Sequence, residues 1–471
     1  MSLGSVLGIA RSGMSAQQLI IDTAGHNIAN VDTEGYSRQR VELSADFTKQ
    51  PMLGQMGNGV RAVDIAQLRD FALDTAYRDE ASGSASSQLR KDLLGGIESL
   101  LGEPSDTGLA AAMDAFWSSW SDLASQPASS AARSVVQQNG QHVAEMLNGF
   151  DRQLVGMRQQ VSTQLDQTVT RINQLSDQIA GYNERIMGAE VGGTTAADLR
   201  DKRNLAIDEL AKLGDTHVIE YPNGSLQVSL GTNTLVDGTT GRHARTIVSS
   251  TGVVGIHLDP GNEPALPFGG TSQAMLDFMN RDLPDVRGQL DALANGLVTA
   301  VNAIHATGEL YPATGAPVAA GNFFDPTHVT AGDISLSAAV AASAQNIAAG
   351  AAAAAIPGPG NNDVALALAG LRSAAGQVTY VDTTGQTQSG SFTSFYGDVA
   401  SRLGARVSAA GTDADVHATL ADQADTRRKS VSGVNLDEEL TTLMRAQQAY
   451  AAAAKVISTA SDMMKTLVDM I

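Results

Sequence analysis

Residues 436–471 read LDEELTTLMRAQQAYAAAAKVISTASDMMKTLVDMI, a stretch without glycine or proline that reaches the last residue of the chain. Apolar side chains recur in it every seven residues. A first series is Leu436, Leu443, Tyr450, Ile457, Met464 and Ile471, and a second is Leu440, Gln447, Ala454, Ser461 and Val468. Because alternate steps of four and three keep both series on one side of a helix, the stretch predicts a long helix with a coiled-coil seam.

The first 31 residues carry a counterpart of this pattern. Leu7, Met14, Ile21 and Ile28 are spaced by seven, and Arg11 and Asp22 are the only charged side chains in this stretch. We expect the two end segments to pair as antiparallel helices. More than one side of the first helix is apolar or neutral, so either an ordinary intramolecular bundle buries it, or the spare surface docks on neighbouring subunits. The candidate assembly interface is Leu7, Met14, Ile21, Ile28, Leu436, Leu440, Leu443, Tyr450, Ile457, Met464 and Val468.

The start of the C-terminal helix is marked by Asn435 and Glu438. The Asn435 side chain can accept an N–H of the first turn, and Glu438 can reach back to the Asn435 N–H, as in a capping box. Just before it, Arg427, Arg428 and Lys429 form the densest basic cluster, which we interpret as a solvated boundary between elements.

Composition limits the class of protein. A chain of 471 residues exceeds one hydrophobic core, and 43% hydrophobic with only 4% aromatic residues favours closely packed helices. The net charge of −19 disfavours nucleic acid and anionic membranes as partners. The chain has no cysteine, no apolar run long enough to span a membrane and no pattern typical of a cleaved signal peptide.

The rest of the chain predicts a mainly α, elongated, multi-domain protein with a small inserted β module and paired coiled-coil-like terminal helices. We expect residues 31–60 to be extended or loop-like, and helices near 65–101, 108–125 and 161–187. Trp117 and Trp120, three residues apart, are expected in the core. Alternating apolar residues and turn signals predict the β module at 216–270.

Three later segments complete this organisation. The helix that contains Pro284 either kinks there or starts afresh at Asp282. The Ala-rich stretch 338–360 predicts a flexible connection, and 380–395 is either a β-hairpin or a loop. The resulting domains are a terminal helical domain, 1–40 and 430–471; a helical body, 41–215 and 271–429; and the β module, 216–270.

Local motifs for chemistry are missing from the sequence. Its eight histidines are scattered, and no pair has the spacing of metal ligands. There is no nucleophile elbow, phosphate-cradling loop or dinucleotide fingerprint. Residues distant in sequence could still converge, but we expect no enzyme, no metal and no cofactor.

The segment 27–39, NIANVDTEGYSRQ, resembles the N-terminal signature N-x-A-N-x-x-T-x-G-Y-x-R of bacterial flagellar rod, hook and hook-associated proteins. It matches at every defined position, and its SRQ ending is most similar to the hook-associated protein 1 members. Residues 432–439 and 443–457 resemble the C-terminal signature of the same members. The signature residues are Asn27, Asn30, Thr33, Gly35, Tyr36, Arg38 and Gln39.

The resemblance implies a structural protein of the hook–filament junction, needed for filament assembly and motility. It implies that the terminal helices form an inner tube around the export channel, and that the chain is secreted by the flagellar type III system without a cleaved signal peptide. The implied partners are other axial subunits, hook protein, hook-associated protein 3 and an export chaperone. The turn at Tyr36 and Arg38 would either orient the chain as it leaves the tube or pack on the body. A hook or distal rod protein, and an enzyme or adhesin with coiled-coil ends, remain as alternatives.

Overall fold

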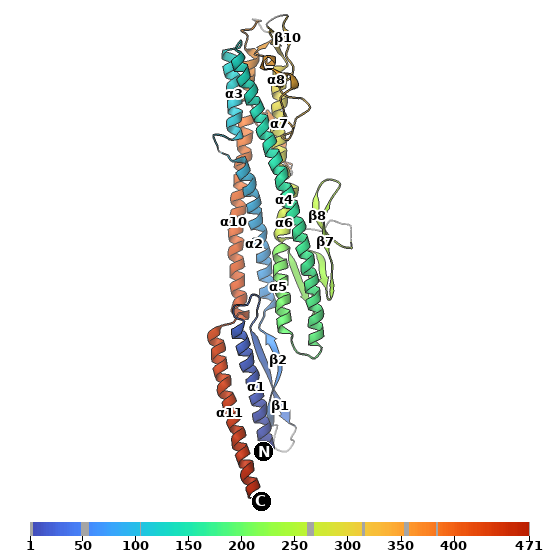
Figure 1. The fold of residues 1–471 in the computed structure, drawn as a ribbon, viewed down its shortest axis with the longest axis vertical. Helices are drawn as coiled ribbons and strands as arrows, with labels where there is room; N and C mark the ends of the chain where they lie inside the picture. Colours follow the sequence, from blue (N-terminus) through green and yellow to red (C-terminus); the bar gives the residue numbers. More distant parts are fainter. Residues whose placement is uncertain are drawn as a thin grey trace.

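The protein is a long rod in which most elements run parallel to the long axis (Figure 1). The computed structural model describes residues 3–48, 56–103, 105–260, 268–312, 316–352, 358–382 and 385–470. Long helices make up most of these residues, and the sheets are small. The predicted fold class, mainly α with a small β module and paired terminal helices, is confirmed.

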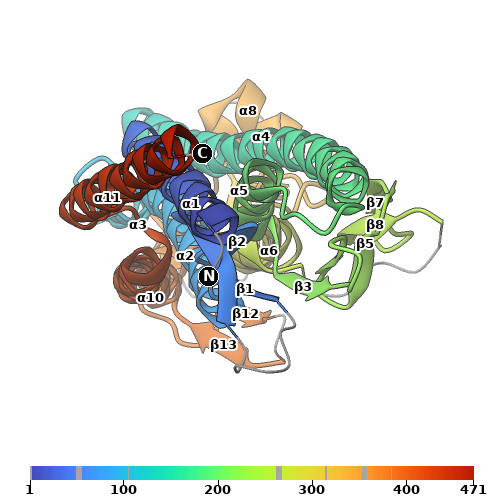
Figure 2. The ribbon, with the colours of Figure 1, turned by 90° about the horizontal axis from the view of Figure 1, so that it is seen from below.

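The lower end of the rod is built from both ends of the chain. Helix α1 (Leu3–Ala29) ascends beside α11 (Leu436–Asp469), which descends, so the two pack antiparallel with the termini close together (Figures 1 and 2). With 34 residues, α11 is about 50 Å long. The antiparallel pairing expected from the sequence is therefore present.

A β-hairpin covers another side of α1. Strands β1 (Gln39–Thr48) and β2 (Met56–Gln67) are antiparallel, and the Val60 N–H donates to Ser12 Oγ of α1 at 3.2 Å. The extended or loop-like structure predicted for 31–60 is confirmed for 31–48 and 56–60, and residues 49–55 lie outside the described residues. The helix predicted from Ile65 was placed too early, because residues up to Gln67 pair with β1.

The body consists of long helices around a continuous apolar core. Helix α2 begins after the N-cap Asp70 and packs along α10, while the 61-residue α4 spans most of the body. Trp117 and Trp120 are buried in this core with Phe116 and Phe323, as predicted. The main helices are α2 (Phe71–Leu101), α3 (Leu109–Ser125), α4 (Ser130–Glu190), α5 (Ala197–Leu213), α9 (Asp363–Gly370) and α10 (Phe392–Ser432).

The β module lies against α4 (Figures 1 and 2). Asn183 of α4 donates to the carbonyls of Leu226 and Gly238, and so replaces bonds that the strand ends lack. The predicted turn at residues 260–262 lies partly outside the described residues. The strands are β3 (Thr216–Glu220), β4 (Leu226–Leu230), β5 (Asn233–Asp237), β6 (Thr240–Gly241), β7 (Ala244–Val248) and β8 (Val254–Leu258), in sheets ordered β3-β4-β5-β6 and β7-β8.

The chain around Pro284 does not start a separate helix, because it stays helical throughout, with helical dihedrals at Asp282 and Leu283. Helix α6 (Gly270–Asp277) runs into a π-helical turn (Phe278–Asp282), and α7 (Leu283–His305) follows with the proline in its first turn. The π-helical turn accommodates the proline: the Leu283 N–H bonds to the Phe278 carbonyl, five residues back, so the regular i−4 pattern is already interrupted where the proline lacks its N–H.

At the upper tip of the rod, the structure contradicts the flexible connection that was expected for 338–360. Instead of a flexible connection, its described residues form short elements, and Val340, Ile347 and Ala348 are buried. The Ala348 N–H donates to Nε2 of the buried His305, which ties this segment to the end of α7. The tip contains β9 (Gly308–Leu310), β10 (Val318–Ala319), α8 (Ala338–Ala342), a 3-10 turn (Ala344–Asn346) and β11 (Gly350–Ala351).

The segment 380–395 contains a hairpin, which decides between the two alternatives for it. Strands β12 (Val378–Val381) and β13 (Thr387–Gly390) pair antiparallel, and α10 begins directly afterwards at Phe392.

Candidate functional site: the terminal helix pair and its joint with the body

The contact between α1 and α11 follows small side chains rather than the bulkiest apolar ones. In α11 the buried residues are Glu439, Ala446 and Ala460, and in α1 they include Ala10, Ala16 and Ala24. Small residues at a helix contact let the backbones approach closely.

The predicted interface residues divide into two groups. Leu443, Tyr450 and Ile457 flank the line of small residues and are half-buried, as are all four predicted residues of α1. The other four are exposed: Leu436, Leu440, Met464 and Val468. Thus only the middle of the first series, Leu443 to Ile457, takes part in the contact with α1, whereas Leu436 and Met464 of that series are exposed together with Leu440 and Val468 of the second. Ile471, which ends the first series, lies outside the described residues.

Helix α11 carries an apolar surface that nothing in the described structure covers, which we call the free surface. Leu440 is 48% and Met444 55% exposed near the upper end. Near the lower end the exposed side chains are Val456, Met463, Met464, Leu467, Val468 and Met470. On α1, by contrast, no described large apolar side chain is exposed to this degree, because the β1–β2 hairpin covers its second side.

Asn27 organises the joint between the terminal pair and the body. Its Nδ2 donates to the Gln39 carbonyl at 2.9 Å and to Glu439 Oε2 at 3.0 Å. Its Oδ1 accepts from the Gln39 N–H at 3.0 Å and from the Tyr36 hydroxyl at 2.8 Å. A buried amide with both donor hydrogens and its acceptor engaged fixes the end of α1 relative to the first strand and to α11.

Arg38 joins the two ends of the chain. Its Nη1 lies 2.6 Å from Glu438 Oε2, its Nε lies 2.6 Å from Glu439 Oε1, and its backbone N–H donates to the Ser432 carbonyl. Asn435 caps α11 as predicted, by accepting from the N–H groups of Asp437 and Glu438. The second half of the predicted capping box is wrong: the Glu438 carboxylate binds Arg38 instead of reaching back.

The remaining signature residues shape the turn after α1. Asn30 Nδ2 donates to the His26 carbonyl, and Thr33 Oγ1 donates to Asn30 Oδ1. Gly35 has a φ of 76°, and a Cβ there would lie 3.2 Å from the Leu205 side chain of α5. Only glycine combines that backbone conformation with so close an approach.

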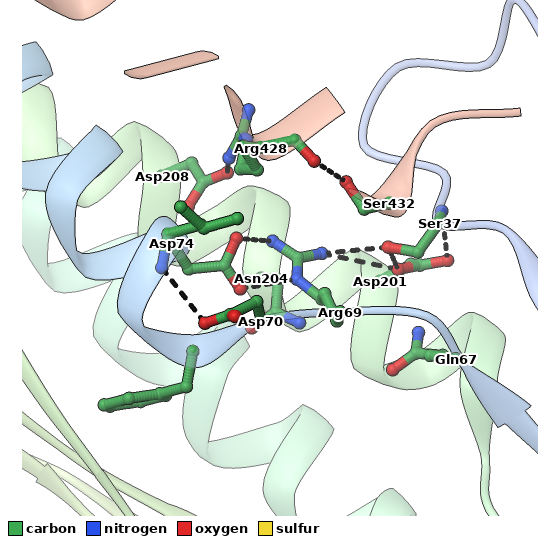
Figure 3. Close-up of polar contacts among 12 residues, drawn as sticks. Ser37, Gln67, Arg69, Asp70, Asp74, Asp201, Asn204, Asp208, Arg428 and Ser432 are labelled. Carbon is green, nitrogen blue, oxygen red and sulfur yellow. Dashed lines mark hydrogen bonds and ion pairs between the residues drawn. The ribbon is translucent and has the colours of Figure 1, made fainter. Parts of the chain in front are cut away.

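Ser37, Gln39 and Arg69 attach this turn to the body. Ser37 donates its N–H and its hydroxyl to the two carboxylate oxygens of Asp201, and Gln39 Nε2 donates to Asp198 Oδ1. Arg69 lies between Asp74 and the Ser37–Asp201 pair (Figure 3). Tyr36 and Arg38, by contrast, make their polar contacts with the terminal helices.

Buried charges in this joint shift the pKa of its groups. Burial raises the pKa of Asp201, although the bonds from Ser37 and the charge of Arg69 oppose the rise. Burial, followed by the charges of Asp198, Asp201 and Glu439, raises the pKa of Tyr36. Tyr36 therefore stays a neutral hydrogen-bond donor at physiological pH.

The basic cluster at 427–429 is not simply a solvated boundary. Arg427 is exposed, but Arg428 lies 2.6 Å from Asp208 Oδ2 (Figure 3). The Arg428 guanidinium also lies 3.7 Å from the centroid of the Tyr77 ring. Asp208 also binds Arg78 at 2.7 Å. Arg428, Asp208 and Tyr77 line a polar cleft of about 730 Å³ between the terminal pair and the body. The sequence signal for Arg428 was missed because its partner is 220 residues away.

In the part of the chain that the structure describes, no three histidine or carboxylate side chains are placed to hold a metal ion. Among the same residues, no helix has the length and hydropathy that crossing a bilayer requires.

Family models match three parts of the chain. The helical domain of flagellar hook-associated protein FlgK matches residues 94–324. The C-terminal model of the flagellar basal body rod FlgEFG proteins matches 430–470, and that of flagellar basal body rod proteins matches 7–36.

Individual relatives agree with these models. Flagellar hook-associated protein 1 of Bacillus subtilis is 28% identical over 98% of this chain and 97% of its own length. The protein of the same name from Escherichia coli is 24% identical over 99% of this chain and all of its own length. A solved structure, the flagellar hook junction protein FlgK from Burkholderia pseudomallei, has a TM-score of 0.62 at 17% identity and covers 76% of this chain and all of that chain. Over nearly its whole length this chain is similar in sequence to flagellar hook-associated protein 1, and its fold is similar to that of the solved FlgK structure.

Proposed function

We propose that the protein is a structural subunit of the junction between the flagellar hook and filament, and that it assembles through the α1–α11 pair. The observation that carries this proposal is the free surface of α11. Exposed large apolar side chains that recur along one helix mark a surface that a partner buries. The resemblance of both chain ends to flagellar axial proteins identifies that partner as a neighbouring axial subunit.

The proposed role of each domain follows the domain boundaries expected from the sequence. Residues 1–40 and 430–471 would form the inner tube, 41–215 and 271–429 the surrounding body, and 216–270 the small β module attached to it. The candidate interface in the tube is Leu7, Met14, Ile21 and Ile28 with Leu436, Leu440, Leu443, Tyr450, Ile457, Met464 and Val468. Of these, the exposed residues of α11 contact neighbours, and the half-buried ones hold the pair together.

The specific partners in this proposal are hook protein on one side and hook-associated protein 3 on the other. Secretion through the flagellar type III system without a cleaved signal peptide places the subunit outside the cell. A cytoplasmic export chaperone would cover α11 before secretion, because its free surface would otherwise promote aggregation. The net charge of −19 gives no basis for binding nucleic acid or inserting into a membrane. The protein has a structural role and catalyses no reaction.

Gene deletion tests the proposed function. A strain without the junction protein keeps its hooks but releases filament subunits into the medium and does not swim. A strain that lacks a hook or distal rod protein makes no hooks, so the same experiment separates the two axial alternatives. Normal filaments on the deletion strain would refute the proposal.

Complementation with point variants then tests the surface. Leu440→Asp places a charge on the free surface and should leave the soluble monomer folded while abolishing motility, since burying an unpaired charge costs several kcal/mol. Thr441→Asp adds the same charge at the neighbouring exposed position and is the matched control. Equal motility of the two variants would contradict the role of the free surface.

A further inference from the structure

Below the β module, four arginines line one pocket. It has a volume of about 270 Å³ and lies where the base of the β1–β2 hairpin, α2, α5 and the first strands of the β module meet. Its wall includes Arg69, Arg78, Arg200 and Arg203, with Asp74 and Glu220 as the only acidic residues that line it. We call it the arginine pocket.

Three of these arginines already have carboxylate partners. Arg69 lies 2.7 Å from Asp74 Oδ2. Arg78 lies 2.7 Å from Asp208 Oδ1. Arg200 lies 2.7 Å from oxygens of both Glu190 and Glu220. The two acidic residues of the wall are therefore used by Arg69 and Arg200, and neither neutralises the fourth arginine.

Arg203 is the exception. Its side chain is among the largest fully buried ones, and the residue is 2% exposed. Nη1 donates to two neutral acceptors, Asn183 Oδ1 at 2.9 Å and the Gly224 carbonyl at 2.7 Å. Nε has no acceptor among the described residues, and Arg203 forms no ion pair with them.

Burying a cation without a counterion costs free energy, and here the positive charge of Arg200 adds to that cost. Burial, and after it the charge of Arg200, lowers the pKa of Arg203 to about 10, against the opposing charges of Glu220 and Glu190. Arg203 is still positively charged at neutral pH. Folded proteins normally give a buried guanidinium a counterion or a full set of hydrogen bonds. A pocket wall that contains Arg203 without a counterion is therefore suited to a negative ligand.

We propose that the arginine pocket binds a small oxyanion of the carboxylate or phosphate class, with its oxygens toward the Arg203 and Arg200 guanidiniums. Arginine's planar fork of donors matches the paired oxygens of both anions. A volume of about 270 Å³ accommodates an anion of this size and excludes a nucleotide with its base and sugar. The ligand would bridge the hairpin base, the body and the β module, and so stiffen the region next to the joint.

Calorimetric titration of the purified full-length monomer tests this site. Sodium phosphate and sodium succinate are each titrated, with sodium chloride at equal ionic strength as the reference. Saturable heat from either oxyanion that chloride does not reproduce is the expected result. Heats that chloride matches for both would overturn the proposal.

Variants assign the binding to the pocket. Arg203→Gln and Arg200→Gln should each weaken binding about tenfold or more, since one charge-assisted hydrogen bond is lost. Arg171→Gln is the control, because it removes an arginine paired with Glu209 that does not line the pocket. If the buried Arg203→Gln fails to fold by circular dichroism, Arg200→Gln decides. Unchanged affinity in the folded pocket variants, or an equal loss in Arg171→Gln, would refute the assignment.

Discussion

Replacing Arg38 with glutamine removes the ion pairs that connect the turn after α1 to the start of α11. The side chain of Glu439 is only 3% exposed, and without Arg38 its carboxylate would keep a single donor among the described residues, Asn27 Nδ2. Glu438 matters less, because its side chain is 59% exposed and water can solvate it. The main effect of Arg38→Gln is therefore a buried carboxylate without a counterion.

Breaking one side of a buried ion pair typically costs about 3–5 kcal/mol. The Arg38 side chain is itself 22% exposed, so we take the lower end, about 3 kcal/mol. This free-energy cost weakens the docking of the α1–α11 pair onto the body and leaves the stability of the body's core unchanged. It corresponds to a roughly 100-fold increase in the population of the undocked state.

Hydrogen exchange followed by mass spectrometry measures this population region by region. In Arg38→Gln, amides of the first half of α11 should exchange up to about 100-fold faster than in the parent protein, while those of α4 near 161–187 stay unchanged. Arg40→Gln is the matched control, since Arg40 is two residues away and exposed. Equal exchange of α11 in the two variants would refute the reasoning.

A second substitution tests the cause. In Arg38→Gln/Glu439→Gln the stranded charge is gone, so much of the lost protection should return even though no ion pair is restored. If the double variant exchanges as fast as Arg38→Gln, the loss comes from packing around residue 38 and not from the buried carboxylate.

The other predictions concern the tip, the turn and the helix contact. Burial lowers the pKa of His305 from 6.5 to about 4, so the unfolded state binds a proton on this residue more tightly than the folded state does. As a result, about 3 kcal/mol of folding stability, fully present above pH 6.5, is lost as the pH falls to 4. Urea titrations should show this loss in the parent protein but not in His305→Gln. Gly35→Ala should cost roughly 1–3 kcal/mol because of its positive φ and the Leu205 contact, whereas Gly25→Ala, on an open side of α1, should stabilise by up to about 1 kcal/mol in thermal denaturation. Leu443→Asp and Ile457→Asp should leave the body's circular dichroism and melting intact but abolish motility, and normal swimming of either strain would count against a packed seam.

Much of the fold could be predicted from periodicity. The pattern in 436–471 identified a long helix, its N-cap and its antiparallel partner, because helix geometry translates spacing directly into a face. The twin tryptophans and the alternating strands near 216–258 were equally informative. In each case the signal lies within one element or between neighbouring ones.

The failures have physical reasons. The predicted seam favoured bulky residues such as Leu440, but the helices meet along Ala446 and Ala460, and sequence spacing does not say which side of an apolar helix its partner takes. The described part of 338–352 was expected to be flexible because of its composition. This segment is ordered because the Ala348 N–H donates to the ring of His305. The sequence gives no reason to connect these two residues.

Only part of the joint could be predicted from the sequence, for the same reason. The signature drew attention to Asn27 and Arg38, but their partners at 438–439 are about 400 residues away, and Asp201 and Arg428 carried no local signal at all. Long-range pairs of charged side chains depend on the assembled fold, which no window of sequence contains.

The most direct test of the account is an electron cryomicroscopy map of the intact hook–filament junction. The account predicts that the α1–α11 pair lies in the wall of the inner tube, and that Leu440, Met444 and Met463 are each buried against neighbouring subunits. A map in which these side chains remain exposed to solvent, or in which the pair lies outside the tube wall, would contradict it.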